Sequence, residues 1–175
     1  ITLPILIETI GNNVFSECLS LTSVKILSQL PSICKDMFYQ CLSLTNISIP
    51  TSVETIGENA FYGCSSLIDI LIPPSVKQIN NNAFFGCISL RKIELPDSVK
   101  IIGKNAFYEC TSLRQLTISS NVETIDDFSF YKCTSLQQIS IPSSVKVIGR
   151  NAFDQCSSIK KVKIDIDQIK IESDA

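Results

Sequence analysis

Residues 50–72 read Pro-Thr-Ser-Val-Glu-Thr-Ile-Gly-Glu-Asn-Ala-Phe-Tyr-Gly-Cys-Ser-Ser-Leu-Ile-Asp-Ile-Leu-Ile. Within them, Leu67, Ile70 and Ile72 form the pattern Leu-x-x-Ile-x-Ile, whose end alternates as in a strand with one buried face. Pro73 comes next, and proline lacks the N–H that a β-ladder needs. The segment therefore predicts a short strand that stops at the proline, after which the chain turns back.

The first half of the same segment predicts the return path. Val53 and Ile56 supply two more apolar side chains. Gly57 belongs to a column with Gly, Asn or Asp in six of seven units, which predicts a tight left-handed turn. Asn59 belongs to a column with Asn or Asp in six of seven units, and Asn is a frequent helix N-cap. We therefore expect one short helical turn after it, with the next Ala and Phe facing the core.

This unit recurs every 23 residues without insertion or deletion. One column holds Cys18, Cys41, Cys64, Cys87, Cys110, Cys133 and Cys156, and another holds Phe15, Phe38, Phe61, Phe84, Phe107, Phe130 and Phe153. One unit cannot bury its apolar positions alone, whereas stacked units can. We predict a single domain, 1–175, of seven repeats with a C-terminal closing segment, 165–175. The predicted repeats are 4–26, 27–49, 50–72, 73–95, 96–118, 119–141 and 142–164.

The predicted fold is an α/β leucine-rich repeat solenoid, because the period lies within the range of about 20–29 residues for this class. We expect a curved horseshoe with eight short parallel strands on its concave side, from residues 1–3 to 162–164. Short return strands and helical turns would form the convex side. Residues 166–172 alternate Ile with polar residues and are expected to pair with or cover the last repeat.

The beginning of the sequence lacks Met and already reads as the end of a repeat. We therefore interpret the chain as part of a longer protein. An uncapped end leaves a solenoid prone to self-association. The formal net charge is −2 and 18% of residues are charged, which argues against nucleic acid as a partner. No apolar run reaches the roughly 18 residues of a membrane-spanning helix, so we expect no direct membrane insertion.

The chain contains no His, which removes the usual general base and the usual partner of a Ser or Cys nucleophile. We predict that it is not an enzyme and that it has no cofactor and no metal site. The seven in-register cysteines are interpreted as a buried ladder of reduced thiols, with disulfides or a metal as alternatives. Cys34 is outside that column, at the turn, and is expected to be the most exposed thiol.

A second aromatic column follows the buried phenylalanines by one residue and holds Tyr39, Tyr62, Phe85, Tyr108 and Tyr131. It suits either a surface that grips a partner or partly buried rings with hydroxyls in water. The outward strand positions of the concave face are the candidate binding surface, and they are mixed and mostly uncharged. They are Ser23, Lys25, Asn46, Ser48, Asp69, Leu71, Lys92, Glu94, Gln115, Thr117, Gln138, Ser140, Lys161 and Lys163.

The run Ile-Pro-x-Ser-Val-x-x-Ile-Gly-x-Asn-Ala-Phe-x-x-Cys-x-Ser-Leu-x-x-Ile resembles the BspA-like leucine-rich repeats. It is clearest in residues 49–70 and 141–162, and the resemblance extends over residues 1–164. Repeat two departs from it at Leu27, Cys34 and Met37. Repeat six departs from it at Ser119, Asp126 and Phe128. The resemblance implies a surface protein of an anaerobic bacterium or a protozoan parasite, and an adhesin that binds host proteins or other microbes.

Together these features predict a non-catalytic protein-binding module for cell adhesion or host recognition. Its partner would be a host, matrix or cell-surface protein, and its location the cell surface or the extracellular space. The alternative is an intracellular, cytoplasmic scaffold for protein–protein interaction, which the many unpaired cysteines fit slightly better.

Overall fold

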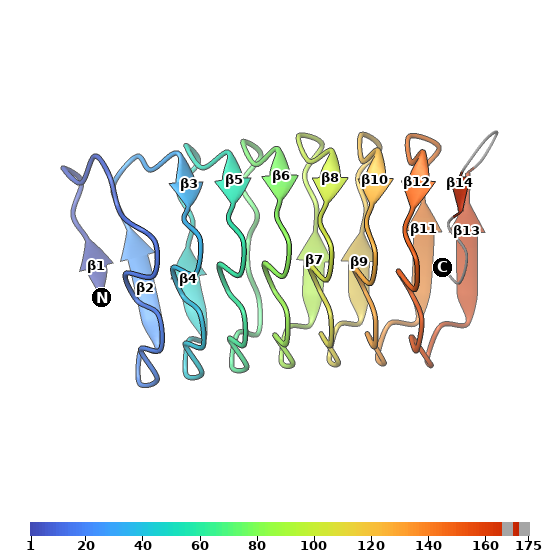
Figure 1. Cartoon of the computed structure of the whole chain (residues 1–175), viewed down its shortest axis with the longest axis horizontal. Helices are drawn as coiled ribbons and strands as arrows, with labels where there is room; N and C mark the ends of the chain where they lie inside the picture. The colour runs from blue at the N-terminus through green and yellow to red at the C-terminus, as the bar shows by residue number, and fades with distance from the viewer. Residues whose placement is uncertain (166–169, 172–175) are drawn as a thin grey trace.

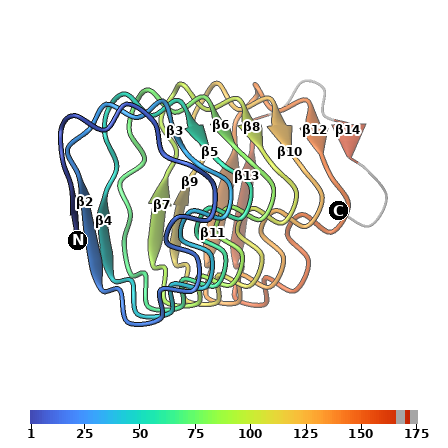
Figure 2. The same ribbon diagram turned by 60° about the vertical axis from the view of Figure 1, so that its left-hand side comes forward.

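The computed structural model of the chain describes residues 1–165 and 170–171. Each repeat forms one coil, and most coils contain a strand and a shorter return strand on the opposite side of the core (Figures 1 and 2). Successive coils lie side by side from the N-terminus to the C-terminus in a nearly straight row (Figure 1). The structure is therefore a parallel β-solenoid built from the predicted repeat.

One side of the solenoid, here called the long-strand face, is the side predicted to be concave. Its strands are β1 (Thr2–Leu3), β2 (Ser23–Ile26), β4 (Asn46–Ser48), β7 (Lys92–Glu94), β9 (Gln115–Thr117), β11 (Gln138–Ile141) and β13 (Lys161–Ile164). They pair in parallel with a register of one repeat, as in Ser23 with Asn46 and Gln138 with Lys161. The expected continuous sheet is interrupted, because the pairs form three sheets: β1-β2-β4, β7-β9 and β11-β13. In the third repeat only a bridge from Asp69 to Lys92 remains.

The opposite side carries one continuous sheet of short return strands. They are β3 (Ser32–Ile33), β5 (Thr55–Ile56), β6 (Gln78–Ile79), β8 (Ile101–Ile102), β10 (Thr124–Ile125), β12 (Val147–Ile148) and β14 (Lys170–Ile171). The last strand, β14, belongs to the segment predicted to cover the last repeat, and it pairs in parallel with β12. The remaining residues of that predicted segment, 166–169 and 172, lie outside the described residues.

The predicted short helical turns are wrong: residues 1–165 contain no helix. Where a helix was expected, alternate N–H groups bond to the next coil. Asn59 N–H donates to the carbonyl of Asn81 at 3.1 Å, and Phe61 N–H donates to that of Ala83 at 2.8 Å. The N–H between them, on Ala60, donates locally to the carbonyl of Gly57. An α-helix keeps its N–H groups for carbonyls four residues back, so this ladder between coils replaces it.

Neither of the two polar columns of the turn has the role predicted for it. Asn59 is not a helix N-cap but has a left-handed backbone, with φ of 53°. Gly57, predicted to be left-handed, does not have a positive φ. It is needed for close approach instead, because a Cβ at this position would lie 2.7 Å from the carbonyl oxygen of Ile33 in the preceding coil.

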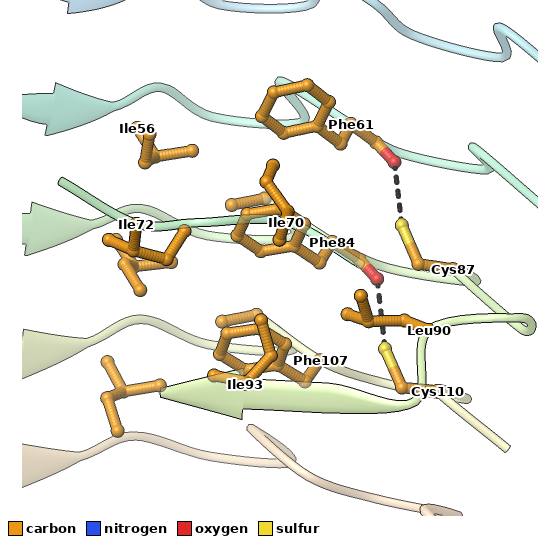
Figure 3. Close-up of a cluster of buried hydrophobic side chains, with 14 of the residues drawn as sticks. Ile56, Phe61, Ile70, Ile72, Phe84, Cys87, Leu90, Ile93, Phe107 and Cys110 are labelled. Atoms are coloured by element: carbon orange, nitrogen blue, oxygen red, sulfur yellow. Dashed lines mark hydrogen bonds between the residues drawn. The ribbon is translucent and has the colours of Figure 1, made fainter. Parts of the chain in front are cut away.

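The core is a column of stacked phenylalanine rings with the aliphatic side chains of both strands around it (Figure 3). Neighbouring ring centroids are 5.1–5.5 Å apart. Five rings, from Phe38 to Phe130, are fully buried. Phe15 and Phe153 are only partly buried, contrary to expectation, because each stacks on a single neighbouring ring.

The spacing between coils is similar on both sides of the solenoid, which does not favour the strong curvature of the predicted horseshoe. Parallel strands repeat at about 4.8 Å. The second aromatic column, on the side where helices were expected, repeats at 4.5–5.0 Å. A solenoid curves when elements on one side are wider than those on the other, and packed helices need about 8–10 Å. Here no side is wider than the strands.

Candidate binding face

The long-strand face places all the predicted binding residues on one surface. Strands alternate their side chains between two faces, and the inward residues Val24, Ile47 and Ile93 are buried in the core. The outward residues are exposed and stand in columns one coil apart. They are Ser23, Lys25, Asn46, Ser48, Asp69, Leu71, Lys92, Glu94, Gln115, Thr117, Gln138, Ser140, Lys161 and Lys163.

Charge is unevenly distributed along this face. Lys92 and Glu94 neutralise each other within β7, with 2.8 Å between Nζ and the carboxylate. Lys163 forms an exposed ion pair with Asp165 at 3.1 Å. The C-terminal part is basic because Lys161 stands beside Lys163, whereas Asp69 makes the third repeat acidic.

This face has shallow hollows that sequence reasoning missed. The larger, about 360 Å³, is lined by Leu116, Thr117, Ile118, Gln138, Ile139, Ser140, Lys161 and Lys163. It lies where β9 and β11 are neighbours without being paired. A second, about 260 Å³, is lined by Asp69, Ile70, Leu71, Ile72, Lys92 and Glu94. In the sequence, the only sign of the missing pairing between β9 and β11 is the irregular start of repeat six, where Ser119 takes the place of the usual proline.

The in-register cysteines form a column of free thiols inside the coil, and no disulfide joins any of the eight cysteines. From Cys41 to Cys156, each Sγ–H donates to the carbonyl of the phenylalanine in the preceding coil, as in Cys87 to Phe61 at 3.2 Å and Cys110 to Phe84 at 3.3 Å (Figure 3). Six of these thiols are buried, but Cys18 in the first repeat is only partly buried, against expectation. The preceding coil supplies the carbonyl that accepts the hydrogen bond of the thiol, and it also shields the thiol from solvent.

Burial makes the central thiols poor nucleophiles. It raises the pKa of Cys41 to about 11 and raises the pKa values of Cys87 and Cys110 well above the usual range. The thiolate is the reactive form, so these groups stay unreactive near neutral pH. Cys34 is partly buried rather than exposed, and its Sγ–H donates to the carbonyl of Ile10 at 3.2 Å.

The second aromatic column consists of rings stacked on one another. Tyr62 and Phe85 have ring centroids 4.6 Å apart at 6°, and Phe85 and Tyr108 have them 4.5 Å apart at 4°. The ring faces are covered by their neighbours, and all five residues are partly buried. The interpretation as partly buried rings is confirmed, because a partner would find ring edges rather than faces to stack on.

Within residues 1–165 and 170–171, no three His, Cys, Asp or Glu side chains converge as metal ligands. Nowhere in the described part of the chain is there a helix with the length and apolarity that crossing a membrane requires.

The sequence profile of the BspA type leucine rich repeat region matches this chain in six copies, over residues 1–86 and 61–175. The chain belongs to the BspA-type leucine-rich repeat family. This confirms the resemblance found in the sequence and agrees with the coil described above. The family fold is generally a non-catalytic scaffold that binds proteins. No relative matches among the curated proteins.

Solved structures of bacterial leucine-rich repeat proteins are similar over nearly the whole chain. A leucine rich cell surface protein from Faecalibacterium prausnitzii is 32% identical, with a TM-score of 0.85, and 95% of this chain covers 47% of that protein. A leucine-rich repeat protein from Bacteroides ovatus is 30% identical, with a TM-score of 0.84, 93% coverage of this chain and 45% of that protein. A Treponema protein, the T. pallidum leucine rich repeat protein, is 27% identical, with a TM-score of 0.80, 91% coverage of this chain and 77% of that protein. The chain thus spans less than half the length of the first two.

Proposed function

We propose that this chain is a non-catalytic recognition module that binds a protein ligand at a cell surface through its long-strand face. The observation that carries the proposal is the array of exposed side chains on parallel strands, neutral polar and charged ones mixed, with hollows between them. Strands anchored to a buried core hold such side chains at fixed spacing, which lowers the entropy lost on binding. The ligand would be a host protein, a matrix protein or a surface protein of another cell.

A surface location is supported by the name of the Faecalibacterium prausnitzii relative, a leucine rich cell surface protein. We place the module on an anaerobic bacterium or a protozoan parasite. The cysteine content does not favour the cytoplasm instead. Buried thiols with raised pKa values resist oxidation, so Cys64, Cys87 and Cys110 can stay reduced outside the cell as well as inside it.

Binding through this face is tested with matched surface variants. Thr117→Arg and Gln138→Arg place bulky charge beside the larger hollow, whereas Gln78→Arg places the same side chain on the exposed side of return strand β6. Binding of each protein to immobilised matrix proteins, such as fibronectin, fibrinogen and collagen, is measured by surface plasmon resonance. We expect the first two variants to lose binding and Gln78→Arg to keep it. Equal binding by all three would place the contact elsewhere.

Location is tested separately. Antibodies raised against residues 1–165 should label intact, unpermeabilised cells, and brief protease treatment of those cells should remove the signal. Labelling that appears only after permeabilisation would support the intracellular scaffold instead.

A further inference from the structure

Leu71 stands out on the long-strand face. Its side chain is 79% exposed, while the residues before and after it in the chain, Ile70 and Ile72, are buried in the core. Every other outward position from β2 to β13 is polar or charged. Asp69 is the outward residue next to it in the same repeat and is also exposed. An aliphatic side chain beside a carboxylate therefore projects from a face whose other outward positions are polar, although Val162 and Ile164 of the last long strand are also exposed.

The same face contains a hollow that complements this projection. Its apolar lining comes from Leu116, Ile118 and Ile139, and the ammonium groups of Lys161 and Lys163 stand at its C-terminal side. Its volume of about 360 Å³ exceeds that of a leucine side chain several-fold. An aliphatic group with a neighbouring carboxylate fits such a lining, since the apolar part leaves water and the acid meets the lysines.

We propose that the long-strand face pairs with the same face of a second copy, with Leu71 of each copy seated in the hollow of the other. Leu71 lies three repeats before Ser140, which lines the hollow. Coils repeat at about 4.8 Å, so the two features are about 14 Å apart along the solenoid. A two-fold axis parallel to the strands, midway between β7 and β9, brings each projection onto the other copy's hollow. Both contacts then form at once, as in any isologous dimer.

The charges agree with this arrangement. The axis places Asp69 of one copy opposite Gln138 of the other. Lys161 of that other copy is one strand further along, and the four-carbon stem of lysine is long enough to reach the Asp69 carboxylate. The row of Lys92 and Glu94 faces neutral residues of β9, and the row of Asn46 faces the lysines of β13. No like charges oppose one another among these six rows. If the two-fold axis passed through the row of Leu71 instead, so that the two leucines met, the two Asp69 carboxylates would also be brought together.

The pairing is expected to be weak. Six overlapping rows cover about 29 Å along the solenoid and about 10 Å along the strands. The resulting area of roughly 300 Å² per copy is well below the roughly 800 Å² of a stable interface. Such a contact becomes effective when many copies face each other on opposed or crowded surfaces, where multivalency multiplies it.

Sedimentation velocity on the whole chain, from micromolar concentrations to about 1 mM, tests the proposal. We expect a reversible dimer, weakened at least tenfold by Leu71→Ser. Leu6→Ser is the matched control, because Leu6 is 87% exposed near the N-terminal end and outside this face. It should leave the dimer unchanged. Asp69→Lys should weaken the dimer, and adding Lys161→Glu should restore it. Circular dichroism confirms that each variant is folded.

A monomer at all concentrations would overturn the pairing, as would a dimer that Leu6→Ser abolishes and Leu71→Ser leaves intact. The latter result would assign self-association to the N-terminal end. The pairing needs only the folded chain and does not depend on the protein ligand proposed above. A ligand bound to the same strands competes with the second copy. Loss of dimerisation in Leu71→Ser with retained ligand binding would separate the two.

Discussion

Phe84 is the residue whose removal should damage the solenoid most clearly. Its ring is fully buried and stacks on Phe61 and Phe107, with both centroid distances 5.1 Å. Truncating a buried Phe to Ala removes transfer free energy and leaves a cavity, which costs about 3–5 kcal/mol. Because both neighbouring coils pack on this ring, local collapse is hindered. We expect a loss of stability at the upper end of that range.

Phe153 provides the control within the same column. It is only partly buried and stacks on one ring, Phe130, at 5.3 Å. Phe153→Ala should therefore cost less than about 2 kcal/mol, since partial burial reduces both the transfer and the cavity contributions. Phe84→Leu should cost about 1–2 kcal/mol because most of the volume is kept.

The measurement is equilibrium unfolding in urea, followed by far-ultraviolet circular dichroism on the wild type and the three variants. A solenoid is stabilised by nearest-neighbour contacts, so interior and terminal positions should differ. If Phe84→Ala lost less than about 1 kcal/mol, or no more than Phe153→Ala, the stacked core would not be the source of stability.

Three further outcomes follow from the structure. In thiol titration of the native protein at pH 8, at most two groups should react quickly, Cys34 and Cys18, because the other six thiols are buried; six or more fast thiols would contradict the column. Gly103→Ala should destabilise strongly, because its Cβ would lie 2.8 Å from a backbone carbon of the preceding coil. Gly86→Ala, with φ of 68° but nothing nearer than 3.8 Å, should cost only about 1 kcal/mol in urea unfolding. Phe128→Asn should stabilise by about 1 kcal/mol, because Phe128 has a left-handed φ of 55° that Asn tolerates; a lower urea midpoint for this variant would refute it.

Phe128 interrupts a column of hydrogen-bonded amide and carboxylate side chains. Asp36, Asn59, Asn82 and Asn105 join their side chains across successive coils, with donor–acceptor distances of 2.8–3.0 Å. The ladder stops where Phe128 takes the place of the amide. The sequence marked repeat six as irregular at this residue, but only the left-handed backbone explains why the amide is preferred there.

The face and the hollow were predictable to different degrees. Alternation in segments such as residues 138–141 correctly assigned Gln138 and Ser140 outward and Ile139 inward. The hollow beside them is lined by side chains of three successive coils, among them Leu116, Gln138 and Lys161, and the alternation within one coil does not show it. The hollow, and with it the proposed seat for Leu71, therefore became visible only in the tertiary structure.

The sequence by itself determined the 23-residue coil, its inward columns and its family, because identical spacing forces identical side chains to stack. It did not determine the turn on the far side. Asn59 suits both a helix N-cap and a left-handed turn, and Gly57 suits both a left-handed turn and a close approach. The tertiary structure decided between them, because the carbonyls of the next coil are there to accept the N–H groups of Asn59 and Phe61. Those acceptors belong to another repeat, so no local pattern could show which hydrogen bonds would form.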